Sequence, residues 1–216
     1  MKRDVRIAFS ADMGFAPVDS EIASIARHSA EALSHELGQQ TTDAHPDVSD
    51  PQACFEALVA LDTDRVGLRR MANAKGVSFG PALRRVLERD WSADAFTSAL
   101  LARKQLSNQM WRFMRDFDFL LSPTVATAAF AADLDAPATI AGMPSGGAGC
   151  APLAAIANLT GLPAASVPVG TTRDGRPVGL QVMGRQLDDV GVLSLCAAIE
   201  RALPWKSWSS SKLSGT

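Results

Sequence analysis

The chain has 216 residues, enough for one large domain or two small ones. Hydrophobic residues make up 47% and charged residues 20%, and the net charge of −2 provides no global field for nucleic acid or anionic lipid. No window approaches the run of about 18 apolar residues that spans a bilayer, and the start lacks the apolar core of a signal peptide, so we expect a soluble cytoplasmic protein with neither nucleic acid nor membrane as a partner.

The first predicted elements are a strand and a helix. The stretch VRIAFSADMG opens with a short apolar run that predicts a buried strand. Residues 16–38 then place apolar side chains at helical spacing. We expect Asp19 to be the N-cap of this helix and Gly38 to end it.

Residues 51–117 are predicted to be mostly helical. The stretches PQACFEALVALDTDRVGLRRMANA and PALRRVLERDW are separated by the breaker KGVSFG, and the long helix SADAFTSALLARKQLSNQMWRFMRDF follows. Acidic residues alternate with the arginines, which predicts solvated helix faces rather than a basic patch. The long helix carries an apolar stripe that we assign to the core: Phe96, Ala99, Leu100, Leu106, Met110, Phe113 and Phe117.

From residue 116 the pattern changes to short strands. DFDFLLSPTV predicts a buried strand, and CAPLAAIANLTG predicts a short helix that ends at Gly161. PAASVPVG and PVGLQVMG predict two strands joined by a hairpin at Asp174 and Gly175. LDDVGVLSLCAAIERALPW predicts a last helix, capped by Asp188 or Asp189.

The predicted hairpin decides the fold class. Its two strands are antiparallel, so a sheet that contains them cannot be wholly parallel. We predict an α/β fold with a mixed β-sheet and flanking helices, forming a single domain over residues 1–208. The polar residues 209–216 are predicted to be a disordered tail.

The stretch GMPSGGAGC contains the most obvious candidates for a nucleophile, Ser145 and Cys150. Lys75 and Lys104 lie in the helical middle, and no predicted pocket lowers the pKa of either for service as a base to Ser145. Cys150 precedes a helix start that favours a thiolate, but no histidine follows it in the chain. We therefore favour a pocket-side loop and keep a Ser or Cys hydrolase as an alternative.

Metal and cofactor sites are not expected. His28 and His35 share one helical face, but His45 lies in a separate loop and no carboxylate cluster joins them. The cysteines are odd in number and far apart, which indicates free thiols in a reducing compartment: Cys54, Cys150 and Cys196.

Five stretches in order resemble the C-terminal half of amidase signature family enzymes: RIAFSADMGFAPVDSEI, DFDFLLSPT, ANLTGLPAASVPVG, DGRPVGLQVMGR and DDVGVLSLCAAIERALPW. Such enzymes hydrolyse carboxamides through a serine nucleophile, which a second serine on a cis peptide bridges to a lysine base. In the family these three residues lie in the N-terminal half. The resemblance therefore implies that this chain supplies fold and pocket wall, has no catalytic residue of its own and is inactive alone.

The resemblance also implies which residues face a substrate's acyl group. They lie in the loop after the SPT strand and at the start of the next helix: Thr124, Phe130, Ile140, Met143 and Cys150. Glutamine-handling members carry an acidic residue at the position of Ala151, which would hold the substrate's ammonium. Its absence favours a small or apolar amide substrate.

Two other functions stay open. As an alternative to the C-terminal portion of an amidase, the chain can be interpreted as a stand-alone binding protein or as a split subunit derived from an amidase, in either case without catalysis. The missing-half interpretation predicts an uncovered apolar face and self-association through it. A small-molecule amide is the expected partner only where an N-terminal half completes the site.

Overall fold

The computed structural model describes residues 5–134, 136–145 and 151–205. The helices in this part of the chain are α1 (Ser20–Leu37), α2 (Gln52–Asp62), α3 (Arg65–Lys75), α4 (Pro81–Glu88), α5 (Ala93–Phe113), α6 (Pro152–Thr160) and α7 (Asp189–Ala202). The strands are β1 (Ile7–Phe9), β2 (Thr41–Asp43), β3 (Phe119–Pro123), β4 (Thr139–Ile140), β5 (Met143–Pro144), β6 (Ala164–Thr171) and β7 (Pro177–Gly184).

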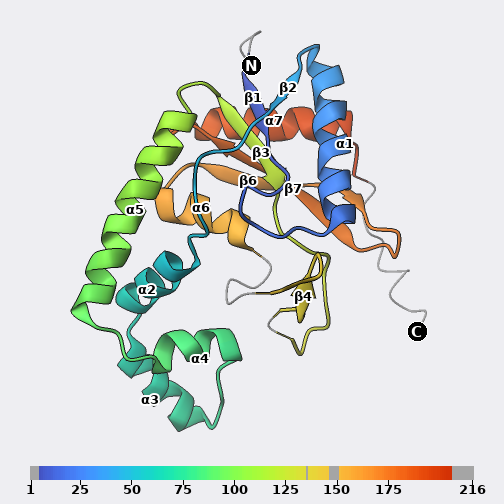
Figure 1. The fold of residues 1–216 in the computed structure, drawn as a ribbon. Coiled ribbons are helices and arrows are strands. Elements are labelled where there is room, and N and C mark those ends of the chain that lie inside the picture. The colour runs from blue at the N-terminus through green and yellow to red at the C-terminus, as the bar shows by residue number, and fades with distance from the viewer. Residues whose placement is uncertain (1–4, 135, 146–150, 206–216) are drawn as a thin grey trace.

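Five strands form one mixed sheet in the order β2-β1-β3-β7-β6 (Figure 1). β1 pairs in parallel with β2 and β3, whereas β7 pairs antiparallel with β3 and β6. The predicted α/β class with a mixed sheet is confirmed. β4 and β5 form a separate two-stranded hairpin that the sequence did not predict, and β2 was not predicted either.

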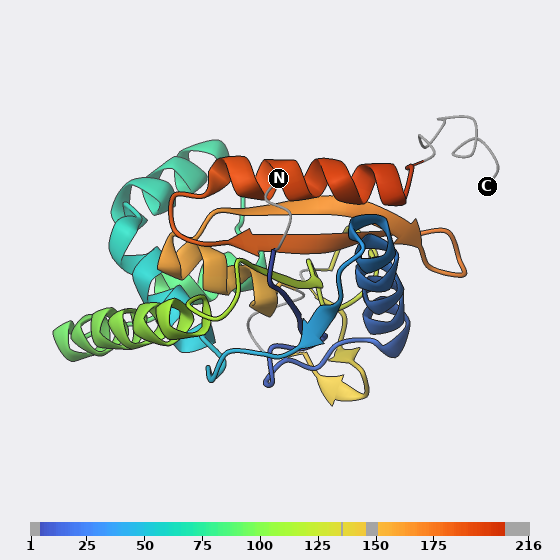
Figure 2. The ribbon, with the colours of Figure 1, turned by 90° about the horizontal axis from the view of Figure 1, so that it is seen from above.

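Helices pack on both faces of the sheet, although one face of the edge strand β6 stays exposed. α1 and α7 pack on one face, and α2, α5 and α6 lie on the other side (Figure 2). The alternation of side chains along β3 divides the core between them, because Phe119 and Leu121 join the α1–α7 side while Leu120 joins the other.

Several predicted helix ends are confirmed. Gly38 and Gly161 both adopt the left-handed conformation that ends a helix, with φ of 63° and 70°. The Asp188 carboxylate accepts a hydrogen bond from the Gly191 N–H and caps α7.

Two details of the helical middle differ from the prediction. The predicted helical stretch over residues 51–74 is divided into α2 and α3. Thr63 is extended, and Asp64 caps the new helix by accepting a hydrogen bond from the Gly67 N–H. The second difference is Leu100, which is 42% exposed instead of packing in the core stripe. The apolar stripe of α5 is therefore narrower than its sequence spacing suggested.

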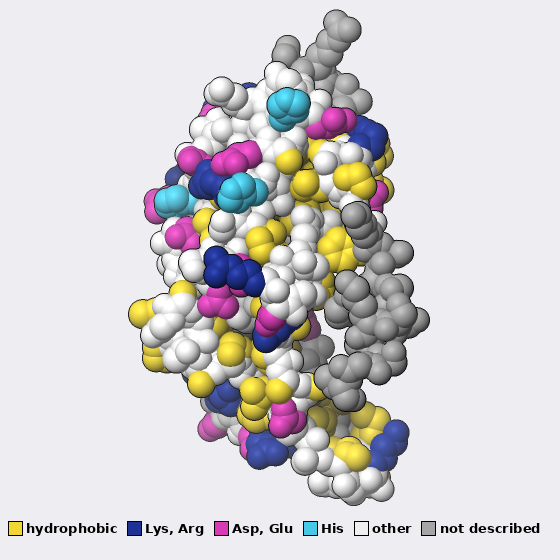
Figure 3. Space-filling view, turned by 90° about the vertical axis from the view of Figure 1, so that its right-hand side faces the viewer, with side chains coloured by type: hydrophobic (Ala, Val, Ile, Leu, Met, Phe, Trp, Pro, Cys, Tyr) yellow, Lys and Arg dark blue, Asp and Glu magenta, His cyan; other side chains and the backbone are white. Residues whose placement is uncertain are grey.

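The surface agrees with the balanced composition. On the face seen in Figure 3, cationic and anionic side chains are interspersed rather than gathered by sign. Among the helices of the described residues, none combines the length and the hydropathy required to cross a membrane. The predicted tail, residues 209–216, lies outside the described residues.

Candidate functional site

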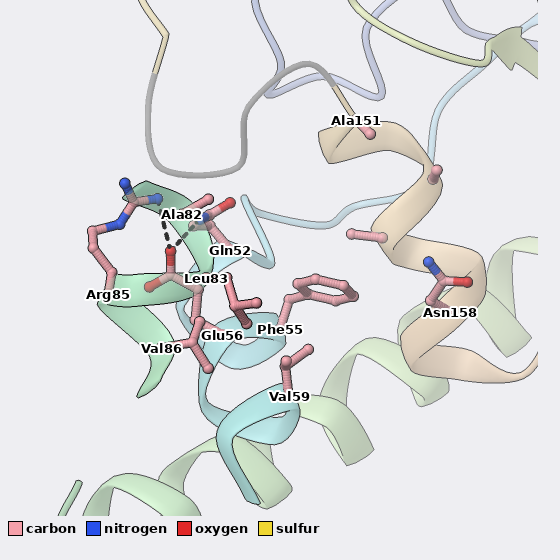
Figure 4. Close-up of a pocket in the computed structure, with 12 residues that line it drawn as sticks. Gln52, Phe55, Glu56, Val59, Ala82, Leu83, Arg85, Val86, Ala151 and Asn158 are labelled. Carbon is pink, nitrogen blue, oxygen red and sulfur yellow. Dashed lines mark hydrogen bonds and ion pairs between the residues drawn. The ribbon is translucent and has the colours of Figure 1, made fainter. Parts of the chain in front are cut away.

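An apolar pocket lies between α2, α4 and α6 (Figure 4). Two of its walls are single helix faces with the spacing i, i+3, i+4 and i+7. They are formed by Gln52, Phe55, Glu56 and Val59 of α2 and by Ala151, Ala154, Ala155 and Asn158 at the start and along one side of α6. The third wall comes from Ala82, Leu83, Arg85 and Val86, on α4.

The size of the pocket suits a small organic group. Its volume is about 290 Å³. An apolar protein cavity of about 150 Å³ holds a benzene molecule, so this pocket has room for more than one ring. The alanines of α6 provide that room, because a methyl side chain leaves the space opposite the Phe55 ring unfilled (Figure 4).

One side of the pocket is polar. The Glu56 carboxylate accepts a hydrogen bond of 2.6 Å from Gln52 Nε2, and Arg85 Nη2 lies 3.6 Å from its Oε1. The Glu56 side chain is largely shielded from solvent, whereas that of Arg85 is half exposed. The negative charge of Glu56 is therefore compensated within the wall, and the remaining lining is mostly apolar.

A pair of hydroxyl side chains lies on the sheet, apart from the residues that line the pocket. The hydroxyls of Thr124 and Ser166 are 2.6 Å apart and hydrogen-bonded, across the position of Gly179. A Cβ at Gly179 would lie 2.6 Å from Ser166 Oγ and 2.9 Å from Thr124 Oγ1. The glycine therefore makes space for this pair of hydroxyl side chains.

The structure describes four of the five residues predicted to line the acyl side, and two of them, Ile140 and Met143, are cross-strand partners in the β4–β5 hairpin. Thr124 is in the hydroxyl pair, Phe130 is half-buried, Ile140 is buried and Met143 is 59% exposed. Cys150 lies outside the described residues. None of the four described residues is among those that line the α2–α4–α6 pocket. Their contact with a substrate stays a prediction.

Ser145, the alternative nucleophile, closes a loop in the structure. Its Oγ donates a hydrogen bond to the Pro137 carbonyl, and its N–H donates to the Ala138 carbonyl at 3.1 Å. Both contacts hold the hairpin of β4 and β5. Lys75 and Lys104 are exposed on α3 and α5, in the environment of ordinary solvated lysines.

The described thiols are not activated. Burial raises the pKa of the Cys54 thiol, although the nearby Arg103 charge acts in the opposite direction. Burial also raises the pKa of the Cys196 thiol, and Glu200 adds to that effect. Within the residues that the structure describes, no three His, Cys, Asp or Glu side chains group as metal ligands would.

Sequence reasoning missed the pocket walls on α2 and α4. A signal exists in α2, where Phe55 and Val59 share a face with Gln52 and Glu56. That face has the same spacing as an ordinary packing stripe, so the sequence does not reveal that it borders a cavity. The cavity depends on helices separated by up to about one hundred residues, since α6 begins at Pro152 and α2 at Gln52.

Comparison with known proteins assigns the family. Residues 1–193 match the Amidase family. The acylamidase of Rhodococcus erythropolis is 30% identical over 211 residues, which cover 94% of this chain and 43% of that protein. A glutamyl-tRNA(Gln) amidotransferase subunit of Pseudothermotoga lettingae is 37% identical over 171 residues, which cover 72% of this chain and 35% of the relative. The chain belongs to the Amidase family.

A solved structure supports the same assignment. A bacterial aryl acylamidase of the amidase signature family aligns with a TM-score of 0.79 and 26% identity, over 94% of this chain and 44% of that one. The chain thus spans less than half the length of these relatives.

Proposed function

We propose that these residues form the part of an amidase that holds the acyl side of a carboxamide substrate, while the nucleophilic serine and its lysine base belong to other sequence. The observation that carries the proposal is the apolar α2–α4–α6 pocket within an Amidase-family fold. Ligand sites are typically concave and mostly apolar, with a few polar groups that fix orientation. This pocket has that composition.

The described residues offer no activated nucleophile that would support an independent hydrolase. Ser145 donates its hydroxyl to a carbonyl, and the pKa values of Cys54 and Cys196 are raised rather than lowered. Acyl transfer needs a nucleophile next to a base and donors for the oxyanion. We accordingly propose that the 216 residues are inactive alone and correspond to the C-terminal half of an amidase.

The substrate class follows from the lining. A neutral aryl or branched alkyl acyl group would bury apolar surface against Phe55, Val59 and Leu83. An α-ammonium group would find no carboxylate at Ala151, and the charge of Glu56 is already paired with Arg85. We therefore propose an amide without charge on its acyl part, in preference to glutamine. The cytoplasm is the proposed compartment.

The test is binding of a neutral aryl amide, such as benzamide, to the purified chain. Methyl shifts of Val59, Leu83 and Val86 in NMR spectra should move in a saturable way. Ala154→Phe places a ring in the pocket and should abolish these shifts, whereas Ala197→Phe on the exposed face of α7 should leave them unchanged. Saturable binding that survives Ala154→Phe would contradict the proposed site.

A second candidate function is a non-catalytic binding protein or split subunit with the same pocket. One observation bears on it: on β6, the side chains of Ala164, Ser166 and Pro168 are exposed on one sheet face, while Val167 and Val169 are buried on the other. A sheet face with this exposure can receive a partner. A complementing amidase half or a second copy of the chain is the partner that we propose.

A further inference from the structure

The inference concerns Asp19, which precedes α1. The sequence predicts that its side chain caps the helix. It stands at the N-cap position, but its carboxylate makes no capping hydrogen bond to α1. The side chain is therefore free for another task, in contrast to Asp64 and Asp188, which do cap their helices.

The carboxylate of Asp19 instead joins two distant loops. Its Oδ2 accepts a hydrogen bond of 2.5 Å from Thr127 Oγ1, in the loop after β3. Its Oδ1 accepts one of 2.9 Å from the Ala141 N–H, at the turn between β4 and β5. The Asp19 N–H also donates to the Ala126 carbonyl at 2.8 Å. Three hydrogen bonds from distant segments thus meet at one half-buried residue.

The turn that Asp19 contacts is conformationally costly. Ala141 and Gly142 have φ of 50° and 76°, the pattern of a two-residue hairpin turn with positive φ at both positions. Such turns favour Asn, Asp or Gly at the first position, and an alanine there is strained. An unfavourable conformation persists where its surroundings impose it, and Asp19 accepts the hydrogen bond of this very residue.

The hairpin also has little stability of its own. β4 and β5 contain two residues each, and a two-stranded hairpin is marginal in water even when it is longer. Burial of Ile140 restrains it, the hydrogen bonds of Ser145 close its base, and Asp19 connects its turn to the start of α1. Met143 lies on this hairpin, and Ala151 follows it in the chain at the edge of the pocket.

We propose that Asp19 is a positioning residue, which holds the β4–β5 hairpin and the loop after β3 in one arrangement on the substrate side of the fold. The substrate-side assignment rests on the proposed function. The positioning itself rests on the two carboxylate contacts and the strained turn. Hydrogen bonds to a charged group are stronger than neutral ones, so their loss should be measurable as local opening.

The test is residue-resolved amide hydrogen exchange by NMR on the full chain. Asp19→Ser keeps a side chain that can cap α1 but is too short to reach both loops. We expect exchange at Ala141 to accelerate by about tenfold or more, with the amides in the first two turns of α1 unchanged within about twofold. Asp64→Ser, at an ordinary cap, is the matched control and should leave the hairpin unaffected.

A second pair of variants tests the contact from the other side. Thr127→Val removes the hydroxyl donor while keeping the shape, and Thr127→Ser keeps the donor. We expect Thr127→Val to increase exchange at Ala141 and Thr127→Ser to restore the slower rate. These variants leave Asp19 in place, so they remain informative if Asp19→Ser fails to fold.

Two results would overturn the proposal. One is an unchanged exchange rate at Ala141 in both Asp19→Ser and Thr127→Val. The other is equal acceleration in α1 and in the hairpin, which would make Asp19 an ordinary helix cap. Amide exchange needs no substrate. Failure of benzamide to bind would therefore contradict the proposed function without affecting the test of Asp19 as a positioning residue.

Discussion

Asp118 is a residue at which charge contributes to the fold. It accepts hydrogen bonds from the backbone N–H of Arg6 at 2.9 Å and from the Arg6 guanidinium at 3.4 Å, and Arg185 Nη2 lies 3.1 Å away. Partial burial alone would raise the pKa of Asp118. The hydrogen bonds from Arg6 and the charges of Arg185 and Arg6 outweigh that effect and hold its pKa below the usual value.

The lowered pKa of Asp118 determines the direction in which the free energy of unfolding changes with pH. A carboxyl whose pKa is lower in the folded state stabilises the fold above the unfolded pKa of about 3.9, and this stabilisation is lost as pH falls through the folded pKa. We predict that Asp118→Asn lowers the free energy of unfolding at pH 7 by about 1 kcal/mol or less, since the pair is partly solvated. Urea denaturation of wild type and Asp118→Asn at pH 7 and at pH 3.5 measures this difference in the free energy of unfolding.

The control for this prediction is Asp116→Asn, at an exposed neighbour of the same turn. It should change the free energy of unfolding little at either pH. The difference between wild type and Asp118→Asn should become smaller at the lower pH. A difference that grows as the pH falls would contradict the assigned role of Asp118.

At the scale of elements, the close contact between α7 and β7 depends on Gly184, which has no side chain. A Cβ at Gly184 would lie 2.5 Å from Val192 Cγ2, and Val192 is buried. Valine cannot turn this methyl group away freely, because its branched Cβ restricts rotation. We predict that Gly184→Ala lowers the free energy of unfolding by about 1–3 kcal/mol.

Val192→Ala removes the methyl group that a new Cβ would meet. The double variant should therefore be less destabilised than the sum of the two single variants, by at least about 0.5 kcal/mol. Thermal or urea unfolding of all three variants measures this coupling. Strict additivity would mean that the destabilisation by Gly184→Ala does not come from contact with Val192, contrary to the packing in the structure.

Elements with local signals were predictable from the sequence, and elements without them were not. Gly38, Gly161 and Asp188 act on the chain next to them, so their helix ends could be placed in advance. β4 and β5 could not, because Ala141 is an unfavourable turn residue that a carboxylate 122 positions away contacts. The break at Thr63 was missed because apolar spacing continues on both sides of it.

The candidate site was predictable only in part. The family resemblance pointed to the loop after β3 and the start of α6; Ala151, at that helix start, borders the pocket, but none of the four described residues predicted to line the acyl side does. Phe55, Val59 and Leu83 could not be named, because cavity walls arise when separate helices approach one another. Helical spacing identifies a buried face but not the empty space beside it.

At the scale of the whole molecule, the chain has an Amidase-family fold, and we propose that its reaction centre is completed by other sequence. The sheet, the apolar pocket and the family match are consistent with carboxamide binding. Nucleophile, base and oxyanion donors are required for turnover, and we propose that the first two come from other sequence. We therefore propose that these 216 residues bind the acyl side of an amide but do not attack it.

Labelling of the folded chain with a fluorophosphonate, read by intact mass and peptide mapping, tests this claim most directly. Circular dichroism and exchange-protected amides establish that the labelled protein is folded, and a complete serine amidase serves as the positive control. We predict no adduct on the chain under conditions that label the control fully. An adduct on Ser145, or on any other serine, would show that the chain carries its own activated nucleophile and would contradict the proposal that it is inactive alone.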